Sequence, residues 1–265
     1  MMSEERGMKV EGLSFTYPDD DVMILNGINI DVKPGDFVCL LGQSGCGKST
    51  LLRVLAGLET ATIGRVEMNG TQIKGASLER GVVFQDYGLF PWMTAGENIV
   101  LALEQKYPAM SKQERKQRAI DTLKRVGLDE EVFYKLPKEL SGGMKQRCAI
   151  ARVLCINPPV LLMDEPFGAL DAVTRAKLQD MLLELWSSGD RQKIVFFVTH
   201  DVDEALLLAN RILVLGQRPS HIIYSCDIPE DKRPTRQTQF EDPYVLNLRN
   251  ELIKSINSDV ASRIA

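Results

Sequence analysis

The sequence predicts an α/β fold with an inserted helical subdomain, and three observations support that prediction. β-rich segments fill the first third of the chain, three successive helical patterns occupy the middle, and alternating strand and helix patterns follow. Alternation of strands with helices is typical of a parallel sheet covered by helices. Helices that follow one another without an intervening strand indicate a separate helical unit.

The first third contains three predicted strands. Lys9–Tyr17 and Ile24–Val32 are short β-rich segments, and an acidic, turn-like run separates them. Asp36–Leu41 is a nearly continuous apolar run bounded by glycines, which is typical of a strand buried on both faces. A glycine-rich loop follows this strand, and the pattern of Thr50–Leu58 then predicts a helix.

The middle of the chain contains the three predicted helices. Thr94–Lys106 opens with a Thr-x-x-Glu capping box. The same kind of signal at Ser111 opens a second helix, which is expected to end near Gly127. A third helix is expected over Ser141–Cys155, because an Asn-Pro-Pro run at 157–159 stops it.

Strand–helix alternation resumes in the last third. The expected elements are strands at Val160–Met163, Ile194–Thr199 and Arg211–Leu215, and helices at Thr174–Ser188, Asp203–Ala209 and Val245–Ile264. The segment Gln217–Asp242 is rich in proline and charge, so we expect it to be irregular.

Composition limits the classes of protein to which the chain can belong. The 265 residues are 44% hydrophobic and 26% charged, and the net charge is −4. This balance argues against a strongly basic nucleic-acid binder and against a polybasic lipid anchor. No apolar run reaches the ~20 residues of a membrane span, and the N-terminus lacks the apolar core of a secretory signal. We therefore expect a soluble intracellular protein.

The cysteines fit that expectation. There are five, and none forms a Cys-x-x-Cys pair, so neither a zinc ribbon nor a disulfide framework is expected. We expect Cys39, Cys148 and Cys155 to pack in the core.

A phosphate-binding motif follows the third predicted strand. It reads Gly42-Gln43-Ser44-Gly45-Cys46-Gly47-Lys48-Ser49-Thr50. This is G-x-x-x-x-G-K-[ST], the P-loop, in its required place between a strand and a helix. Backbone N–H groups of such a loop surround phosphate oxygens, and the helix N-terminus attracts the same oxygens. We expect Lys48 on the β- and γ-phosphates and Ser49 on Mg²⁺. The glycines are spaced as GxxGxG and not as the GxGxxG of a dinucleotide-binding loop, so a loop of that kind is excluded.

A pair of carboxylates lies at the end of a later predicted strand. The apolar run that begins at Val160 ends in Asp164 and Glu165, at the carboxyl edge where ligands bind in α/β sheets. We expect Asp164 to complete the Mg²⁺ site and Glu165 to orient or deprotonate the attacking water. Taken alone, the pair is also compatible with two solvated acids at a strand end.

A P-loop alone is compatible with kinases, GTPases, helicases and transporters. The run from Glu139 to Arg147, which contains Leu-Ser-Gly-Gly-Met, resembles the LSGGQ signature of ABC-type ATPases and precedes the strand of Asp164. Other motifs of that family have counterparts here in the right order: the adenine-stacking aromatic Tyr17, the Q-loop Gln85, the D-loop ending at Asp171 and the switch His200. The resemblance covers residues 8–225 approximately.

The resemblance implies a role for each matching residue. Tyr17 would stack on adenine, although an isolated tyrosine is more often strand packing. Gln85 would contact metal or water and report the nucleotide state. His200 would bridge the γ-phosphate and the water, although a lone histidine is usually structural. Asp171 would organise a dimer seam.

The signature run implies a second copy of the ATPase. Ser141, Gly142 and Gly143 would start a helix whose amides grip the γ-phosphate held by another subunit. Two copies, identical or different, would therefore close head-to-tail around two ATP molecules. Met144 replaces the usual glutamine, which removes any contact made by that side chain but leaves the backbone amides.

The family also implies a division of the chain. It has a RecA-like P-loop NTPase core, an N-terminal antiparallel β subdomain and an inserted α-helical subdomain. We expect one ABC ATPase domain over residues 8–245, with a core of about 8–86 and 158–225 and a helical subdomain of about 87–157. Residues 226–265 would form an extension with a terminal helix and without a regulatory barrel.

Within the family, Phe84–Thr94 resembles the Q-loop region of bacterial importer subunits for nitrate, sulfonate, taurine and similar small anions, and Gly216–Ser220 is loosely similar to a segment of that group. Such a chain would bind permease subunits at the cytoplasmic face of the membrane and, through them, act with a solute-binding protein. Tyr87, Phe90 and Trp92 are expected permease contacts, with core packing as the alternative. An export ATPase and a soluble mechanical clamp remain alternative functions.

Overall fold

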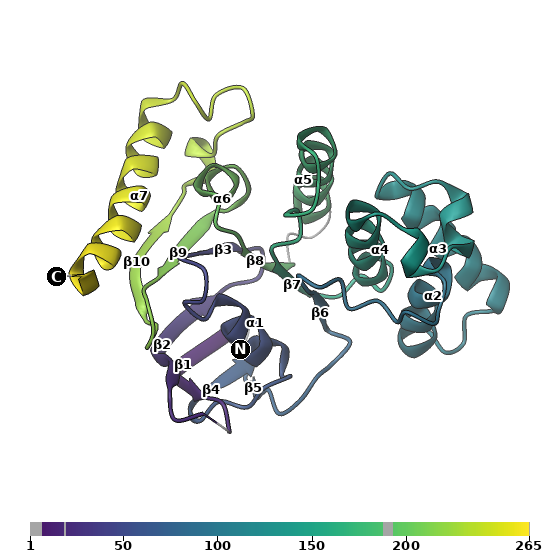
Figure 1. Cartoon of the computed structure of the whole chain (residues 1–265), viewed down its shortest axis with the longest axis horizontal. Coiled ribbons are helices and arrows are strands. Elements are labelled where there is room, and N and C mark those ends of the chain that lie inside the picture. The colour runs from purple at the N-terminus through teal and green to yellow at the C-terminus, as the bar shows by residue number, and fades with distance from the viewer. Residues whose placement is uncertain (1–6, 19, 188–192, 265) are drawn as a thin grey trace, which may run out of the picture. The chain divides into compact units, whose positions relative to one another are not determined.

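The computed structural model describes residues 7–18, 20–187 and 193–264, and it divides into two compact units. One unit comprises Met1–Ala76 with Gly189–Ala265, and the other comprises Ser77–Ser188. Figure 1 shows the elements of both units. The mixture of strands and helices confirms the predicted α/β class.

An antiparallel sheet forms the N-terminal part of the first unit. Its strand order is β2-β1-β4-β5, where the bounds are β1 Met8–Thr16, β2 Met23–Val32, β4 Ile63–Met68 and β5 Thr71–Gln72. Val10 of β1 lies opposite both Ile30 and Val66, which are buried with it. The strands β4 and β5 were not predicted, because most of their side chains are exposed and show no apolar pattern.

A second sheet forms the centre of the first unit, in the order β10-β9-β3-β8, and its strands β9, β3 and β8 are parallel. The strands β3 Phe37–Leu41 and β8 Ile194–Val198 are buried at every residue, as the apolar runs predicted. The strand β9 Arg211–Leu215 pairs in parallel with the other side of β3. Carboxyl ends of parallel strands share one edge, so the segments that follow β3 and β8 emerge together.

The edge strand β10 corrects one prediction. Ile222–Asp227 pairs antiparallel with β9, although the whole segment 217–242 was expected to be irregular. None of its residues is fully buried. A half-exposed edge strand among prolines and charges lacks the apolar run that marks a central strand.

Three α-helices complete the described part of the first unit. They are α1 Lys48–Ala56, α6 Val202–Leu208 and α7 Pro243–Ile264. The helix α1 follows the predicted P-loop and ends at Gly57, whose φ of 77° lies in the left-handed region. The terminal helix α7 was predicted, and it buries Val245, Leu248 and Leu252 at helical spacing.

The second unit contains two parallel strands and the predicted run of helices. The strands are β6 Arg80–Val83 and β7 Val160–Asp164. The helices are α2 Ala95–Lys106, α3 Lys112–Arg125, α4 Gly142–Leu154 and α5 Ala172–Ser187, with 3₁₀ turns at Glu130–Tyr134 and Pro137–Glu139. A further 3₁₀ turn, Glu230–Lys232, belongs to the first unit. Both predicted capping boxes are present, with Thr94 bonded to the Glu97 amide and Ser111 to the Glu114 amide. The predicted end of α5 at Ser188 lies outside the described residues.

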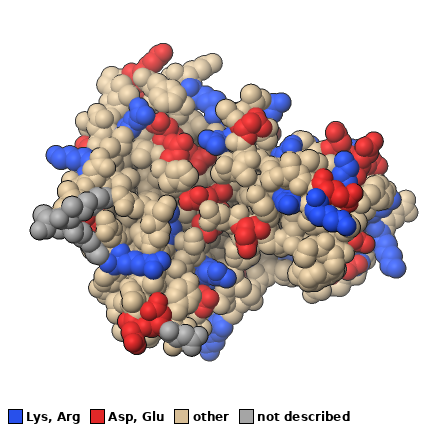
Figure 2. Space-filling model, viewed as in Figure 1, with Lys and Arg blue, Asp and Glu red and all other residues tan. Residues whose placement is uncertain are grey.

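The surface agrees with the modest net charge. Figure 2 shows acidic and basic side chains interspersed over the face in view. Among the described residues, every helix is too short or too polar to cross a bilayer. The thiols of Cys39, Cys148 and Cys155 are buried, as predicted, and free.

Candidate nucleotide-binding site

The P-loop follows β3 as a tight turn, and two positions in that turn accommodate only glycine. A Cβ at Gly42 would lie 2.6 Å from the Leu215 carbonyl oxygen and 2.9 Å from Cys46 Sγ. Gly47, with φ 113°, caps α1, and a Cβ there would lie 3.0 Å from Ile24 and Leu25 side-chain carbons. The loop therefore packs tightly against its surroundings on the inside, whereas Gln43, Ser44 and Gly45 are exposed.

Lys48 spans this loop with its ammonium group. Its Nζ donates hydrogen bonds of 2.8 Å to the carbonyls of Gly42 and Gln43, and the side chain is almost fully buried. Burying a charge is costly unless polar groups satisfy it. The loop carbonyls do so here, and they hold the cation at the N-terminus of α1, where phosphate anions bind.

Tyr17 is tied to the same helix. Its hydroxyl and the Thr50 hydroxyl share a hydrogen bond of 3.2 Å, and Phe15 meets the Tyr17 ring edge-on with 4.8 Å between centroids. These two contacts fix the ring beside the P-loop helix. Ser49, next to Thr50, is exposed.

The predicted switch residue His200 follows β8, the parallel neighbour of β3. The Thr199 amide donates to the Leu40 carbonyl at 3.3 Å, which joins the two strand ends. His200 is exposed at this edge. The first unit therefore places Tyr17, the P-loop and His200 on neighbouring elements.

The second unit presents Asp164 and Glu165 at the end of β7. Asp164 is the last residue of the strand and is buried. Glu165 has a φ of 45°, in the left-handed region that non-glycine residues rarely adopt. Such backbone strain concentrates at functional sites, because the surrounding structure has to enforce it. Glu165 shares this feature with Asn69, Tyr87 and Asn157, and no sequence pattern predicted it.

The signature residues form the start of α4, as predicted. Ser141 caps the helix, and its hydroxyl oxygen accepts from the Met144 amide at 3.3 Å. A Cβ at Gly142 would lie 3.2 Å from the Tyr87 hydroxyl, and one at Gly143 would lie 3.3 Å from the Ala169 carbonyl. The signature glycines therefore pack against both the segment after Gln85 and the D-loop.

Gln85 itself is exposed, and the residues after it are held from α4. Arg152 donates to the carbonyls of Gly88 at 2.5 Å and Tyr87 at 3.3 Å. Tyr87 has a φ of 68°, which this contact helps to maintain. No sequence pattern predicted Arg152, because its partners are backbone atoms more than sixty positions away.

A second anchor, Asn98 of α2, was also missed. It is fully buried, its side-chain oxygen accepts from the Phe90 amide, and its amide group donates to the carbonyls of Phe90, Met93 and Thr94. The loop that it holds presents two exposed aromatic rings. Trp92 is 71% exposed and Phe90 is 39% exposed, with 5.5 Å between ring centroids.

Asp171 has a local structural role. Its carboxylate accepts from the amides of Val173 and Thr174 at 3.1 and 2.9 Å and so caps α5. Hydrogen bonding to Thr174 lowers the pKa of Asp171. Capping of the helix by an ionised aspartate explains this residue without any ligand.

The donor set for a metal is sparse. Among the described residues, no three His, Cys, Asp or Glu side chains gather as a metal site. Magnesium differs from zinc in this respect, because it is bound through one or two protein oxygens together with phosphate and water. The Ser49 hydroxyl and the Asp164 carboxylate are oxygen donors of the required kind.

Cys46 gives the first testable prediction. Its side chain is buried in the P-loop, and burial raises the pKa of its thiol. We expect N-ethylmaleimide to react slowly with Cys46 at neutral pH, since the thiolate is the reactive form. Because Cys46 Sγ lies against Gly42, the added group should abolish ATP binding. Mass spectrometry and equilibrium ATP binding measure both effects. Cys46→Ala should stay competent after the same treatment, and equal inactivation of this variant would contradict the prediction.

The sequence and structure resemble known proteins. A family model described as ABC transporter matches residues 25–168. The nitrate import ATP-binding protein NrtD of Synechococcus elongatus is 43% identical over 91% of this chain and 88% of that protein. The bicarbonate transport ATP-binding protein CmpD of the same organism is 43% identical over 91% of this chain and 87% of that protein. A dimeric post-hydrolysis structure of the ATP-binding cassette MJ0796, bound to ADP and Pi, has a TM-score of 0.77 and 34% identity, covering 84% of this chain and 99% of that one.

Proposed function

The chain belongs to the ABC transporter family and is one of its ATP-hydrolysing cassettes, and on this premise we propose that it powers the import of a small anion. What supports the ATPase part of the proposal most is a glycine loop whose carbonyls bind Lys48, together with a signature helix capped by Ser141. The relatives named for nitrate and bicarbonate favour a small inorganic anion as the solute.

In this proposal the first unit binds ATP. Tyr17 stacks on adenine with a ring already fixed by Phe15 and Thr50. The P-loop amides and Lys48 bind the phosphates. Ser49, Asp164 and Gln85 would be the oxygen ligands of Mg²⁺, which would neutralise phosphate charge when bound.

The proposed chemistry is the attack of water on the γ-phosphate. Glu165 accepts the proton of the water or orients it, and His200 contacts the γ-phosphate and the water. The parts of the reaction that the chain supplies are positioning and charge stabilisation, which dominate phosphoryl transfer.

We propose further that two copies of this chain, or this chain and a similar one, complete each site. Ser141, Gly142 and Gly143 would present the N-terminus of α4 to the nucleotide of the other copy, and Asp171 would lie at the seam. The cassette MJ0796 is dimeric in its structure with ADP and Pi, which supports the association of two copies.

The transmembrane path is proposed to come from separate permease subunits. The exposed pair Phe90 and Trp92 on its anchored loop is the proposed contact. Binding would place the chain at the cytoplasmic face of the membrane. A solute-binding protein would deliver the anion to the permease, without contacting this chain.

Trp92→Ala tests the proposed contact. Because buried tryptophans often contribute about 2 kcal/mol or more to an interface, we expect roughly 30-fold weaker association with the permease. Co-purification from membranes measures it, with thermal unfolding as a check of the fold. Tyr134→Ala is the matched control, since Tyr134 is also an exposed aromatic side chain of this unit. Equal association of both variants would exclude this loop as the contact.

A further inference from the structure

The two residues that flank His200 are held by hydrogen bonds. The Thr199 hydroxyl donates to the buried Glu204 carboxylate at 2.6 Å and accepts from the Asp201 amide at 3.1 Å. The Asp201 carboxylate caps α6 by accepting from the amides of Asp203 and Glu204 at 2.9 and 3.2 Å. The position of His200 is therefore set by the first turn of α6.

Helix α6 has only seven residues, and side chains of the C-terminal region donate hydrogen bonds to its first and last turns. At the first turn, Arg249 of α7 donates to the Asp203 carboxylate at 2.9 Å. At the last turn, Arg233 donates to the Leu208 carbonyl at 2.7 Å. Figure 1 shows α7 beside α6 and β10. Isolated helices of this length are unstable in water, so external contacts fix the orientation of α6.

The helix α7 is itself anchored independently of Arg249. Its buried residues Val245, Leu248 and Leu252 pack on the unit, and Glu251 accepts from the Tyr224 hydroxyl at 2.8 Å. Near its other end, Asp259 accepts from the Gln217 amide at 2.8 Å. A change of the Arg249 side chain alone should therefore leave α7 docked.

We propose that Arg249 is a positioning residue for His200, acting through Asp203 and the first turn of α6. The inference rests on the catalytic role proposed for His200. It makes the terminal helix part of the scaffold of the site, although the helix lies outside the motifs that identify the family.

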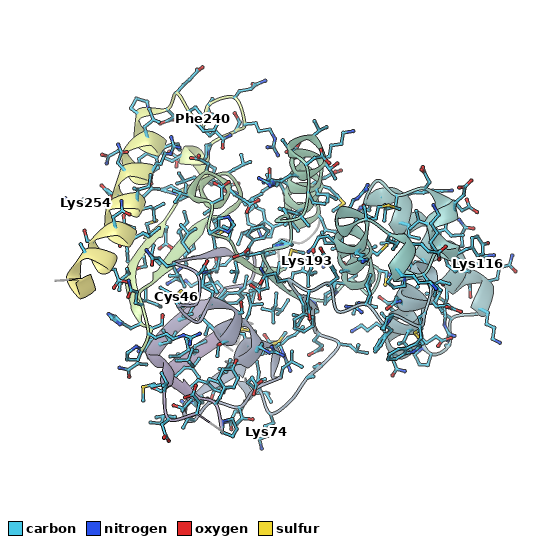
Figure 3. All side chains as sticks on the ribbon, viewed as in Figure 1. Cys46, Lys74, Lys116, Lys193, Phe240 and Lys254 are labelled. Carbon is cyan, nitrogen blue, oxygen red and sulfur yellow. The ribbon has the colours of Figure 1, made fainter. Side chains whose placement is uncertain are left out.

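The geometry favours this role over simple stabilisation. The side chains of Arg249 and Asp203 are 36% and 33% exposed, and partly exposed ion pairs contribute little to stability. The Arg249 guanidinium also lies over the Phe240 ring, 6.0 Å from its centroid, which limits the directions that it can take. Phe240 precedes α7, as Figure 3 shows. The Arg249–Asp203 ion pair therefore restricts the orientation of the first turn of α6 more than it adds stability.

The test compares Arg249→Gln with Lys254→Gln in the full-length chain. Lys254 is an exposed cation of the same helix, labelled in Figure 3, and it serves as the matched control. We expect Arg249→Gln to lower kcat for ATP by about 3- to 30-fold. KM, ATP affinity and the melting temperature should stay near those of Lys254→Gln. Arg249→Lys, which keeps the charge, should recover part of the rate.

A His200→Ala background separates positioning from general damage. If Arg249 acts through His200, Arg249→Gln should cause no further loss of kcat in that background. Equal kcat for the Arg249→Gln and Lys254→Gln variants would overturn the inference and leave the proposed function standing. The same fold-loss in both backgrounds would also overturn it. Parent-like turnover of His200→Ala itself would overturn the proposed role of His200 together with this inference.

Discussion

Glu165→Gln should bind ATP like the parent chain and hydrolyse it about 10²- to 10⁴-fold more slowly, which is the usual effect of losing a general base. The amide has nearly the shape of the carboxylate, so the strained backbone at φ 45° and the turn to Gly168 should persist. What is lost is the carboxylate that is proposed to orient the water or accept its proton. Phosphate release and equilibrium binding of ATP measure the two properties separately.

A matched control guards the interpretation of that experiment. Glu131 is an exposed glutamate of the same unit, and Glu131→Gln should hydrolyse ATP at the parent rate. Turnover by Glu165→Gln within a factor of about ten of the control would contradict the assignment of Glu165, since general-base effects exceed that value.

Lys48→Met should weaken ATP binding by on the order of 10- to 100-fold, the equivalent of the roughly 1.5–3 kcal/mol assigned to hydrogen bonds with charged groups. Methionine keeps the apolar volume of the buried stem but removes the only group that bonds both the Gly42 and Gln43 carbonyls in the described loop. The loss should therefore combine a missing phosphate contact with a looser P-loop. Isothermal titration with ATP measures the affinity.

The comparison for this variant is Lys74→Gln, which removes an exposed cation of the same unit. Figure 3 labels Lys74 away from Cys46 of the P-loop. Equal ATP affinity of the two variants would show that Lys48 contacts no phosphate. A large drop in the melting temperature of Lys48→Met alone would instead indicate that the lysine chiefly holds the loop.

The sequence predicted those parts of the site that depend on short-range chemistry. The P-loop, the cap at Ser141 and the carboxylates at the end of β7 each involve residues that are close in the chain. The spacing of these residues in the chain was therefore enough to indicate the chemistry expected of them. The central strands β3 and β8 were predicted for the same reason, because burial on both faces leaves an apolar run.

Contacts between distant segments were not predictable in this way. Arg152 bonds a carbonyl group 64 positions away, and Arg249 bonds an aspartate 46 positions away. The partners of Asn98 lie only four to eight positions away, but they are backbone groups, which leave no pattern in the sequence. Strands β4 and β10 were missed because neither contains a continuous buried run: three residues of β4 are exposed, and no residue of β10 is fully buried. The strained φ of Glu165 likewise depends on its surroundings and leaves no pattern in the sequence.

ATP hydrolysis by this cassette should drive the import of an anion. The most direct measurement is uptake of labelled nitrate or bicarbonate into vesicles that contain the co-purified permease, with the binding protein outside and MgATP inside. We predict uptake that depends on ATP and stops with Glu165→Gln, while Glu131→Gln supports the parent rate. Uptake that continues at the parent rate with Glu165→Gln, or ATP-driven movement of the anion in the opposite direction, would contradict the claim.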